Sequence, residues 1–336
     1  MVFSGIQMVA RVGVLIGCLS VLNASVEARE AEAAHPLLYV TNQDAGTVSV
    51  VDTETDDIVD TFEVAPGPAV IAAAPDGKRL FISHPDEGKI TVLEGAGLRS
   101  PRICEVKGEP FGIAATADGR LYVSDWNRDL LTVLDADTCT KEAEIPTGKS
   151  PAHLVAPAGG RRIFVANREG DSVSVIDTDR LSVIANVAVG KSPFALAASP
   201  RGDRLYVANV KSSDVTVLNT GGLQQVATVR TGKMPYGVAV TPDGNKALVA
   251  NQQSGTVDFL DSEILEVVQR VTVGRYPESV AILPDGRKTY IINWFSGDIS
   301  VLNTETGEEF TRIDIGDGAR SLAVVAPGRD ATARTN

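Results

Sequence analysis

One sixteen-residue pattern recurs seven times along the chain. LYVANVKSSDVTVLNT, from Leu205 to Thr220, has a close copy in IFVANREGDSVSVIDT, from Ile163 to Thr178. The seven copies begin at Leu38, Leu80, Leu121, Ile163, Leu205, Ala247 and Thr289, in steps of 42 residues with a single step of 41. A fixed period of about 20–50 residues is the signature of repeat architectures, so this pattern restricts the fold more than composition does.

Each repeat contains the same series of segments and turns. An aliphatic-aromatic segment such as LYVAN is followed by a polar turn and an alternating segment such as DVTVLNT. A more polar segment comes next, then a G-x-x-P turn and a small-residue apolar segment that ends in a Pro-Asp-Gly-type turn. Short Val- and Ile-rich runs with frequent Gly and Pro predict strands, and no apolar 3.6-residue period runs for three turns.

Seven units of four short strands predict an all-β protein, a seven-bladed β-propeller of four-stranded antiparallel blades. The small-residue strand should face the crowded central axis, and the charged strand should form the outer edge, where charge discourages edge pairing. The chain enters the first unit at its LYV strand and ends after an unpartnered inner-type strand, ARSLAVVAPGRD from Ala319 to Asp330. We therefore expect this C-terminal inner strand to join the three strands of residues 37–64 and close the ring. The predicted propeller spans residues 35–330.

The first 34 residues differ in kind from the repeats. A single cation, Arg11, precedes an apolar run from Val12 to Leu22, and small residues follow it. This order is that of a secretory signal peptide, because eleven apolar residues are too few to span a bilayer. We expect export to the periplasm, with the mature chain starting between residues 25 and 35. Cys18 offers the alternative of lipidation, and residues 331–336 are expected to be a disordered tail.

Composition and cysteine content limit the possible partners and covalent cross-links. The chain of 336 residues has a net charge of −12, which argues against nucleic acid as a partner, and no other apolar run is long enough for a membrane span. Beyond the signal, Cys104 and Cys139 remain. In an oxidising compartment they are candidates for a disulfide, the alternative being two unpaired thiols in neighbouring strands. Without a Cys/His cluster or C-x-x-C spacing, the sequence predicts neither a metal site nor a cofactor.

The repeats resemble those of the YVTN family of β-propellers. The resemblance rests on YVTN (Tyr39 to Asn42), FVAN (Phe164 to Asn167), YVAN (Tyr206 to Asn209) and LVAN (Leu248 to Asn251), together with the PDG and G-x-x-P turns. It covers residues 36–327 and implies an exported bacterial propeller. Some members accompany periplasmic quinoprotein and cytochrome oxidation systems, and related propellers are subunits of amine dehydrogenases and nitrite reductases. The motif itself is a packing motif and implies no catalytic residue.

Departures from the repeat mark candidate binding residues. The fifth position is Asn or Asp except for His84, and we interpret it as structural. The next position holds the only two tryptophans, Trp126 and Trp294, in units that lie nearly opposite in a seven-membered ring, and Phe295 follows the second. We expect their turns to share a face with the G-x-x-P turns. Aromatic anchors on one face favour a ligand or protein contact, and the alternative is that each tryptophan covers its own blade.

The G-x-x-P turns carry a second asymmetry. After the Gly, four successive units have a cation, namely Lys149, Lys191, Lys233 and Arg275. These cations could receive a small anionic ligand or an acidic patch on a partner protein, or they could simply be lysines in exposed turns. Just after the Pro position come Phe111, Phe194, Tyr236, Glu278 and Arg320, with His153 one residue further on. We expect these residues at the mouth of the central channel, and we interpret His84 and His153 as polar turn residues rather than ligands.

The sequence therefore predicts a non-catalytic binding or interaction protein of the periplasm, a monomer or a subunit of a complex, allied with a quinoprotein or cytochrome oxidation system. Two alternatives remain. One is the propeller subunit of an amine dehydrogenase-like periplasmic enzyme, with the cofactor in another chain. The other is a lactonase-like hydrolase at the channel mouth, which would need Glu278, Arg320 and His153 to converge. No catalytic residue is assigned.

Overall fold

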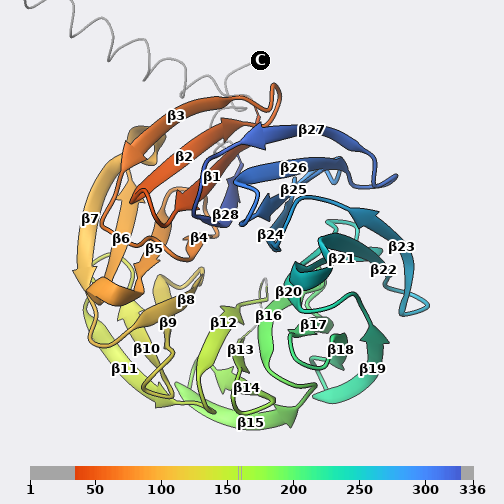
Figure 1. Ribbon diagram of the computed structural model, residues 1–336. Helices are drawn as coiled ribbons and strands as arrows, with labels where there is room; N and C mark the ends of the chain where they lie inside the picture. Colours follow the sequence, from red (N-terminus) through yellow and green to blue (C-terminus); the bar gives the residue numbers. More distant parts are fainter. Residues whose placement is uncertain (1–34, 158, 160, 327–336) are drawn as a thin grey trace, which may run out of the picture.

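The computed structural model describes residues 35–157, 159 and 161–326. These residues form seven four-stranded antiparallel sheets arranged in a ring (Figure 1). The predicted secretory signal, the lipidation alternative at Cys18 and the predicted tail lie outside the described residues. No helix in the described part of the chain is long and apolar enough to cross a membrane.

The innermost strand of each blade lines the central axis. From blade 1 to blade 7 the inner strands are β28 (Ala319–Val325), β4 (Ile71–Ala73), β8 (Pro110–Ala115), β12 (Pro151–Val155), β16 (Pro193–Ala198), β20 (Pro235–Val240) and β24 (Pro277–Ile282). The second strands are β1 (Leu37–Asn42), β5 (Leu80–His84), β9 (Arg120–Asp125), β13 (Arg162–Asn167), β17 (Arg204–Asn209), β21 (Lys246–Asn251) and β25 (Lys288–Asn293). The small-residue strand is innermost, as predicted, because close approach at the axis leaves little room.

Two further strands complete each blade outward. The third strands are β2 (Thr47–Asp52), β6 (Lys89–Glu94), β10 (Leu130–Asp135), β14 (Ser172–Asp177), β18 (Asp214–Asn219), β22 (Thr256–Asp261) and β26 (Asp298–Asn303). The outer strands are β3 (Ile58–Glu63), β7 (Ser100–Glu105), β11 (Lys141–Pro146), β15 (Ser182–Ala188), β19 (Gln224–Arg230), β23 (Glu266–Thr272) and β27 (Glu309–Asp314). Three short 3-10 turns, η1 (Pro85–Glu87), η2 (Ala96–Leu98) and η3 (Gln252–Ser254), interrupt the described loops.

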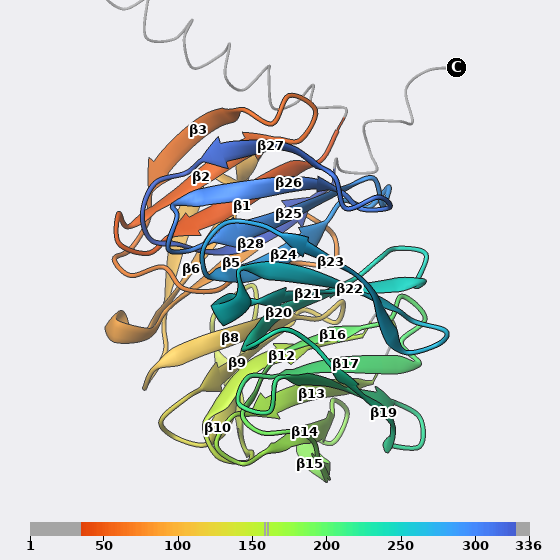
Figure 2. The ribbon, with the colours of Figure 1, turned by 45° about the vertical axis from the view of Figure 1, so that its right-hand side comes forward.

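The ring is closed by pairing between the two ends of the described chain. β28 pairs antiparallel with β1, with Leu37 opposite Val325 and Val40 opposite Leu322, so blade 1 has the order β28-β1-β2-β3. Figure 2 shows β28 lying beside β1 within this blade. The predicted fold and closure are therefore confirmed.

The apolar core is divided among the gaps between blades. Seven clusters of buried side chains each pack two neighbouring sheets, as where Tyr206 of β17 meets Val249 of β21. Because each blade buries its faces only against its neighbours, one repeated residue pattern serves all seven junctions.

Basic side chains tie most blades to the next. A cation at the start of a second strand, or just before it, reaches the outer turn of the following blade. The pairs are Arg79 with Asp137, Arg120 with Thr178, Arg162 with Thr220, Arg204 with Ser262, Lys246 with Glu305 and Lys288 with Thr53. The last pair joins blade 7 to blade 1, so it reinforces the closure that β28 makes.

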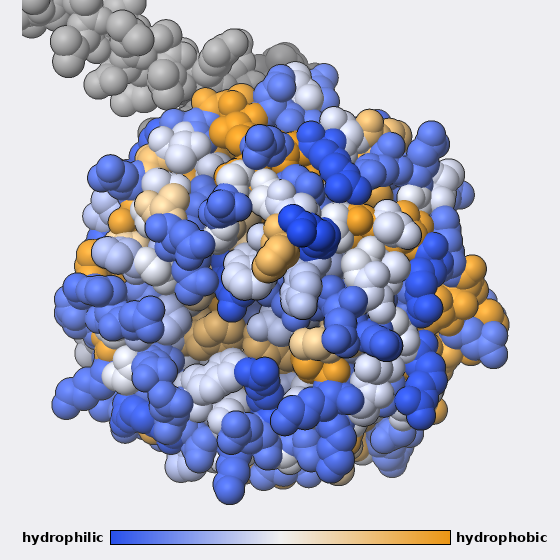
Figure 3. Space-filling view, in the orientation of Figure 1, coloured by the Kyte–Doolittle hydropathy of each residue, from blue (hydrophilic) through white to orange (hydrophobic). Residues whose placement is uncertain are grey.

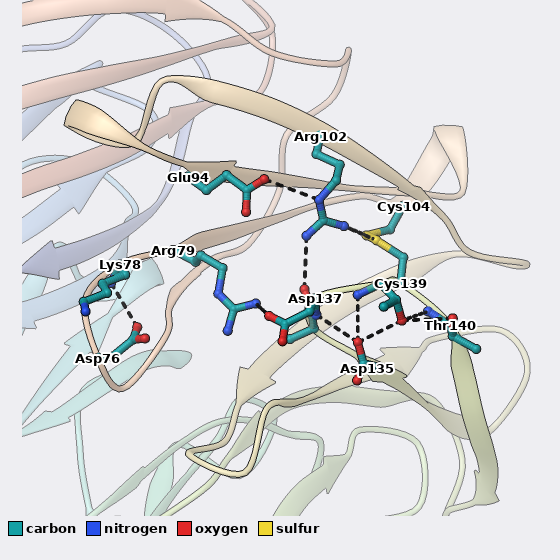
Figure 4. A network of polar contacts seen from close by, with 12 residues as sticks. Asp76, Lys78, Arg79, Glu94, Arg102, Cys104, Asp135, Asp137, Cys139 and Thr140 are labelled. Atoms are coloured by element: carbon teal, nitrogen blue, oxygen red, sulfur yellow. Dashed lines mark hydrogen bonds and ion pairs between the residues drawn. A yellow bond between two sulfur atoms is a disulfide. The ribbon is translucent and has the colours of Figure 1, made fainter.

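Cys104 and Cys139 form a disulfide between blades 2 and 3, with their Cα atoms 5.5 Å apart (Figure 4). Cys104 lies in β7, and Cys139 lies in the turn that follows β10. The guanidinium of Arg102 lies between the two blades, where it donates to the carbonyl oxygen of Ala136 at 3.1 Å and approaches Glu94 at 3.5 Å. These contacts belong to a blade junction and touch none of the channel-mouth residues.

Candidate binding site at the mouth of the central channel

The G-x-x-P turns and the turns after the second strands share one face of the ring. Pro110 of β8 lies opposite Asp125 of β9, directly beside Trp126. The backbone N–H of Trp294 donates to the carbonyl oxygen of Tyr276 at 3.0 Å. Both tryptophans therefore lie on this face, which we call the mouth face.

A chamber of about 200 Å³ lies in the channel below this face. All seven inner strands contribute to it, and the fourth residue of six of them forms an aliphatic floor: Ile113, Leu154, Leu196, Val238, Val280 and Leu322. The predicted mouth residues form its wall, namely Phe111, His153, Phe194, Tyr236, Glu278 and Arg320. Figure 3, which views the ring along the channel, shows apolar surface in a central hollow within a mainly hydrophilic face.

One half of the wall is aromatic. The ring centroids of Phe194 and Tyr236 lie 4.0 Å apart, and those of Phe111 and Phe194 lie 5.8 Å apart. Trp126 packs edge-on against Phe111 at 5.2 Å. These rings come from blades 3, 5 and 6 and form one apolar cluster at the mouth. Burial raises the pKa of Tyr236 to about 12, so its phenol stays protonated at neutral pH.

The other half of the wall is ionic. Nη1 of Arg320 donates to both carboxylate oxygens of Glu278, at 3.1 and 2.9 Å. Nε2 of Gln252 also donates to Oε1 of Glu278, at 2.6 Å. The Glu278 residue is only 5% exposed, and burial raises the pKa of its carboxyl while Arg320 opposes that shift. The Arg320 guanidinium also lies 5.7 Å over the ring of Trp294.

His153 lies between these halves. It lies in a bulge of β12, between the paired residues Pro151 and Leu154, and its ring packs 5.3 Å from Phe111 and 4.9 Å from Phe194. Burial lowers the pKa of His153 to about 4, and the positive charge of Arg320 adds to the effect. The imidazole is therefore neutral at physiological pH, and it has no hydrogen-bond partner among the described residues. The interpretation of His153 as a polar turn residue is wrong, because it is a strand residue that lines the chamber.

The rim of the mouth face on blade 7 carries an exposed aromatic cluster. Tyr276, Trp294 and Phe295 have ring centroids 5.5 to 6.4 Å apart, and Arg275 stacks 4.8 Å over Phe295. Phe295 is 53% and Tyr276 39% exposed, whereas Trp294 is half-buried. Tyr276 has a φ of 55°, a left-handed conformation unusual for a bulky residue. The preceding three blades place Ser150, Ser192 and Met234 at this strained position.

The four predicted cations lie in equivalent turns of blades 4 to 7 but have different surroundings. Nζ of Lys191 pairs with Asp171 at 2.7 Å. Arg275 belongs to the rim cluster, and Lys149 and Lys233 are exposed. Neither of these two lysines has a carboxylate partner within the described ranges. None of these four cations lines the chamber.

Sequence reasoning missed Arg168, Gln252 and Tyr276. Arg168 lies with its guanidinium 4.9 Å over Trp126 and 5.8 Å over Phe194, so it covers the aromatic half of the mouth. Arg168 and Gln252 occupy the same repeat position as the two tryptophans, and this position holds five different residue types among the seven blades. Comparing all seven residues at that position, rather than only the tryptophans, would have singled them out.

The asparagine position is structural, as predicted. Nδ2 of Asn167 donates to Ser174 at 2.9 Å, and Asn42, Asn209 and Asn293 make the equivalent bond. His84 replaces the asparagine in blade 2, where its ring nitrogens contact the carbonyl oxygen of Pro66 at 2.9 Å and Oγ1 of Thr91 at 2.8 Å. It is fully buried at the end of β5, so its interpretation as a turn residue is wrong.

A larger hollow of about 700 Å³ lies on the opposite face between blades 7 and 1. Turn residues such as Glu54, Asp285 and Arg287 line it, together with His35. The mouth chamber, which the inner strands enclose, is the better-defined site.

Comparisons with known proteins support the β-propeller fold. The family model described as the cytochrome D1 heme domain matches residues 159–311, from just before β13 into β27. A comparison with curated proteins yields no match.

Three similar solved structures illustrate the range of this fold. Hydrazine synthase of Kuenenia stuttgartiensis is 22% identical with a TM-score of 0.71, covering 80% of this chain and 92% of that one. A putative 6-phosphogluconolactonase of Bacteroides fragilis is 14% identical with a TM-score of 0.76, covering 87% and 98%. Dihydro-heme d1 dehydrogenase NirN, in complex with DHE, is 15% identical with a TM-score of 0.65, covering 88% and 76%. At these identities the likeness concerns the β-propeller fold.

Proposed function

We propose that this chain is an exported, non-catalytic binding module whose mouth face binds a protein partner. The observation that carries the proposal is the rim cluster of Tyr276, Trp294, Phe295 and Arg275. Aromatic residues and Arg dominate the binding energy of protein interfaces, and an exposed apolar patch on a soluble protein marks an interaction site. A tyrosine held in a left-handed turn, where blades 4 to 6 have Ser or Met, favours a function for the exposed ring over packing.

The charge of the rim favours a partner with an acidic patch. The whole chain has a net charge of −12, yet Lys149, Lys233 and Arg275 extend along one arc of the mouth face. Complementary charge steers association and fixes orientation. We infer that these cations guide an acidic partner surface toward the aromatic rim.

The comparisons support a redox setting for this partner. Hydrazine synthase and a heme d1 dehydrogenase contain the same fold, and the family model that matches blades 4 to 7 is named for a heme domain. We propose membership of the YVTN family and association with a quinoprotein or cytochrome oxidation system. The chain would then be a regulatory or assembly protein, or alternatively the propeller subunit of a periplasmic dehydrogenase with its cofactor in another chain.

The described channel does not fit a heme of its own. The chamber of about 200 Å³ is smaller than the ~300–1,000 Å³ of pockets for drug-sized ligands. The rings of Phe194 and Tyr236, 4.0 Å apart, also narrow its mouth. We therefore assign no tetrapyrrole to this channel.

Export agrees with the disulfide between Cys104 and Cys139, because disulfides persist in oxidising compartments. We propose that residues 1–34 direct the chain to the periplasm, with cleavage between residues 25 and 35. N-terminal sequencing of the periplasmic protein tests this directly, and an uncleaved or lipidated N-terminus would contradict it.

A lactonase-like hydrolase is the second candidate, because Glu278, Arg320 and His153 line one chamber. Arg320 engages both oxygens of Glu278, and the low pKa of His153 makes it a weak base. These features favour binding over catalysis. Hydrolysis of 6-phosphogluconolactone that is lost in Glu278→Gln would support the hydrolase instead.

Affinity purification from periplasmic extract of the source organism tests the docking proposal. The tagged wild type should capture a subunit that stains for covalent heme or for a quinone cofactor. The double variant Tyr276→Ser/Phe295→Ser should lose it, while Phe310→Ser, which removes a similarly exposed Phe from β27, should retain it. Capture by the double variant at wild-type yield, or captured subunits without heme or quinone, would overturn the proposal.

A further inference from the structure

The chamber is charged asymmetrically. Two guanidinium groups lie at its mouth, Arg320 on the ionic side and Arg168 on the aromatic side. Glu278 neutralises Arg320 through both carboxylate oxygens. Arg168 has no carboxylate partner among the described residues, and its positive charge acts across the mouth on Tyr236. The mouth therefore carries one uncompensated positive charge.

The interior of the chamber is apolar. Its floor consists of aliphatic side chains from six blades, and Phe111 and Phe194 flank the entry above them. The neutral imidazole of His153 lies between those two rings, without a polar partner in the described ranges. An imidazole N–H in such a place offers a hydrogen bond to whatever enters.

The size of the chamber limits its occupant. About 200 Å³ corresponds to roughly seven water molecules at ~30 Å³ each. A ligand on the order of ten non-hydrogen atoms fits, and drug-sized molecules need more space.

We propose that the chamber binds a small organic monocarboxylate with a compact apolar or aromatic body. The body rests on the aliphatic floor between Phe111 and Phe194. The carboxylate lies at the mouth, where it accepts hydrogen bonds from the guanidinium of Arg168 and from the ring N–H of His153. Charge-assisted bonds of this kind are the stronger ones, and the apolar walls strengthen them further. This proposal rests on the mouth face being the binding face, and it is independent of which protein binds the rim.

Benzoate, benzamide and benzylamine are matched probes of similar size that carry a negative, neutral and positive group. Isothermal titration of the full-length mature protein should show benzoate binding at least tenfold more tightly than benzamide, with no detectable benzylamine binding. Benzoate should also change the fluorescence of Trp126, and the Trp126→Phe variant should lack that change.

Variants separate the charge from the shape of the chamber. Arg168→Gln should weaken benzoate binding tenfold or more and leave benzamide binding unchanged. Arg180→Gln, in an exposed turn after β14, is the matched control and should bind like the wild type. Val238→Phe should fill the chamber and abolish binding of both probes, with circular dichroism reporting whether the fold is intact.

Several outcomes would overturn the proposal. They are no saturable benzoate binding up to about 10 mM, benzylamine binding as tightly as benzoate, or an unchanged benzoate affinity in Arg168→Gln. If benzoate binds as expected but the rim variants still capture their partner, the docking proposal alone fails. If the rim variants lose the partner but no probe binds, the chamber proposal alone fails.

Discussion

Arg320 and Glu278 join the last described strand of the chain to the inner strand of blade 7. Nη1 of Arg320 lies 3.1 and 2.9 Å from the two carboxylate oxygens of Glu278, between the inner strands of blades 7 and 1. The same pair forms the ionic half of the chamber wall, so one contact both holds β28 against blade 7 and builds the candidate site.

Arg320→Met should destabilise the protein strongly. The variant leaves the Glu278 carboxylate buried with only Gln252 as a partner, and breaking one side of a buried ion pair costs about 3–5 kcal/mol. The loss of unfolding free energy should be smaller at pH 5, because protonation of the Glu278 carboxylate removes its buried charge. Urea unfolding at both pH values measures this. A double variant, Arg320→Met/Glu278→Gln, should be more stable than the single one, and equal stabilities would contradict the account.

His153→Phe should remove part of the acid sensitivity of the fold. The pKa of His153 is lowered from 6.5 to about 4, so the unfolded chain binds a proton below pH 6.5 that the native state does not. Proton uptake by His153 therefore favours the unfolded chain below pH 6.5. The free energy of unfolding is highest above pH 6.5 and falls by about 1–3 kcal/mol as the pH drops toward 4. Between pH 7 and 4.5 the wild type should lose more unfolding free energy than the variant. Glu278, present in both proteins, cancels from the comparison.

Removal of the disulfide should lower stability without unfolding the ring. Cys104 and Cys139 are 35 residues apart, and closing a loop of that length stabilises by about 4 kcal/mol on the chain-entropy model. Cys104→Ala/Cys139→Ala should show this loss in chemical unfolding, and reductant should lower the stability of the wild type but not of the variant. An unchanged midpoint on reduction would show that the bond does not form in solution.

Deletion of the residues after Gly318 should open the ring. It removes β28, which pairs with β1 along its whole length, and leaves β1 as an unprotected edge over apolar residues such as Leu38. Size-exclusion chromatography should show aggregates or no soluble protein. A chain ending after Ala326 keeps β28 and is the control. A cooperatively melting monomer from the shorter chain would contradict the closure mechanism.

The sequence predicts the fold almost completely because every blade packs against its neighbours through equivalent residues of the repeat. Tyr206 packs in one cluster with Val249 of the next blade, and the equivalent residues of the other blades pack in the same way. The period alone therefore specifies seven similar junctions. The unpaired inner strand at the C-terminus predicts the closure for the same reason: blade 1 lacks that strand at its own start.

The candidate site depends on contacts that a period cannot encode. Arg168 of blade 4 lies over Trp126 of blade 3, and Glu278 of blade 7 meets Arg320 of blade 1. Position near the Pro predicts the chamber wall, His153 included, and the bulge that holds His153 in β12 recurs in β8, β16 and β24. The left-handed turn at Tyr276 is likewise invisible in the sequence, because Ser and Met occupy the same conformation in other blades.

Hydrogen exchange of the chain alone and bound to its copurified partner tests the central claim, that the mouth face is the binding face. The account predicts slowed exchange in residues 126–129, 168–171, 275–277 and 294–297, which form the mouth-face turns. Residues 53–57, 243–245 and 285–287, in turns of the opposite face, should exchange at the same rate in both states. Protection of the opposite face, with the mouth face unchanged, would contradict the account.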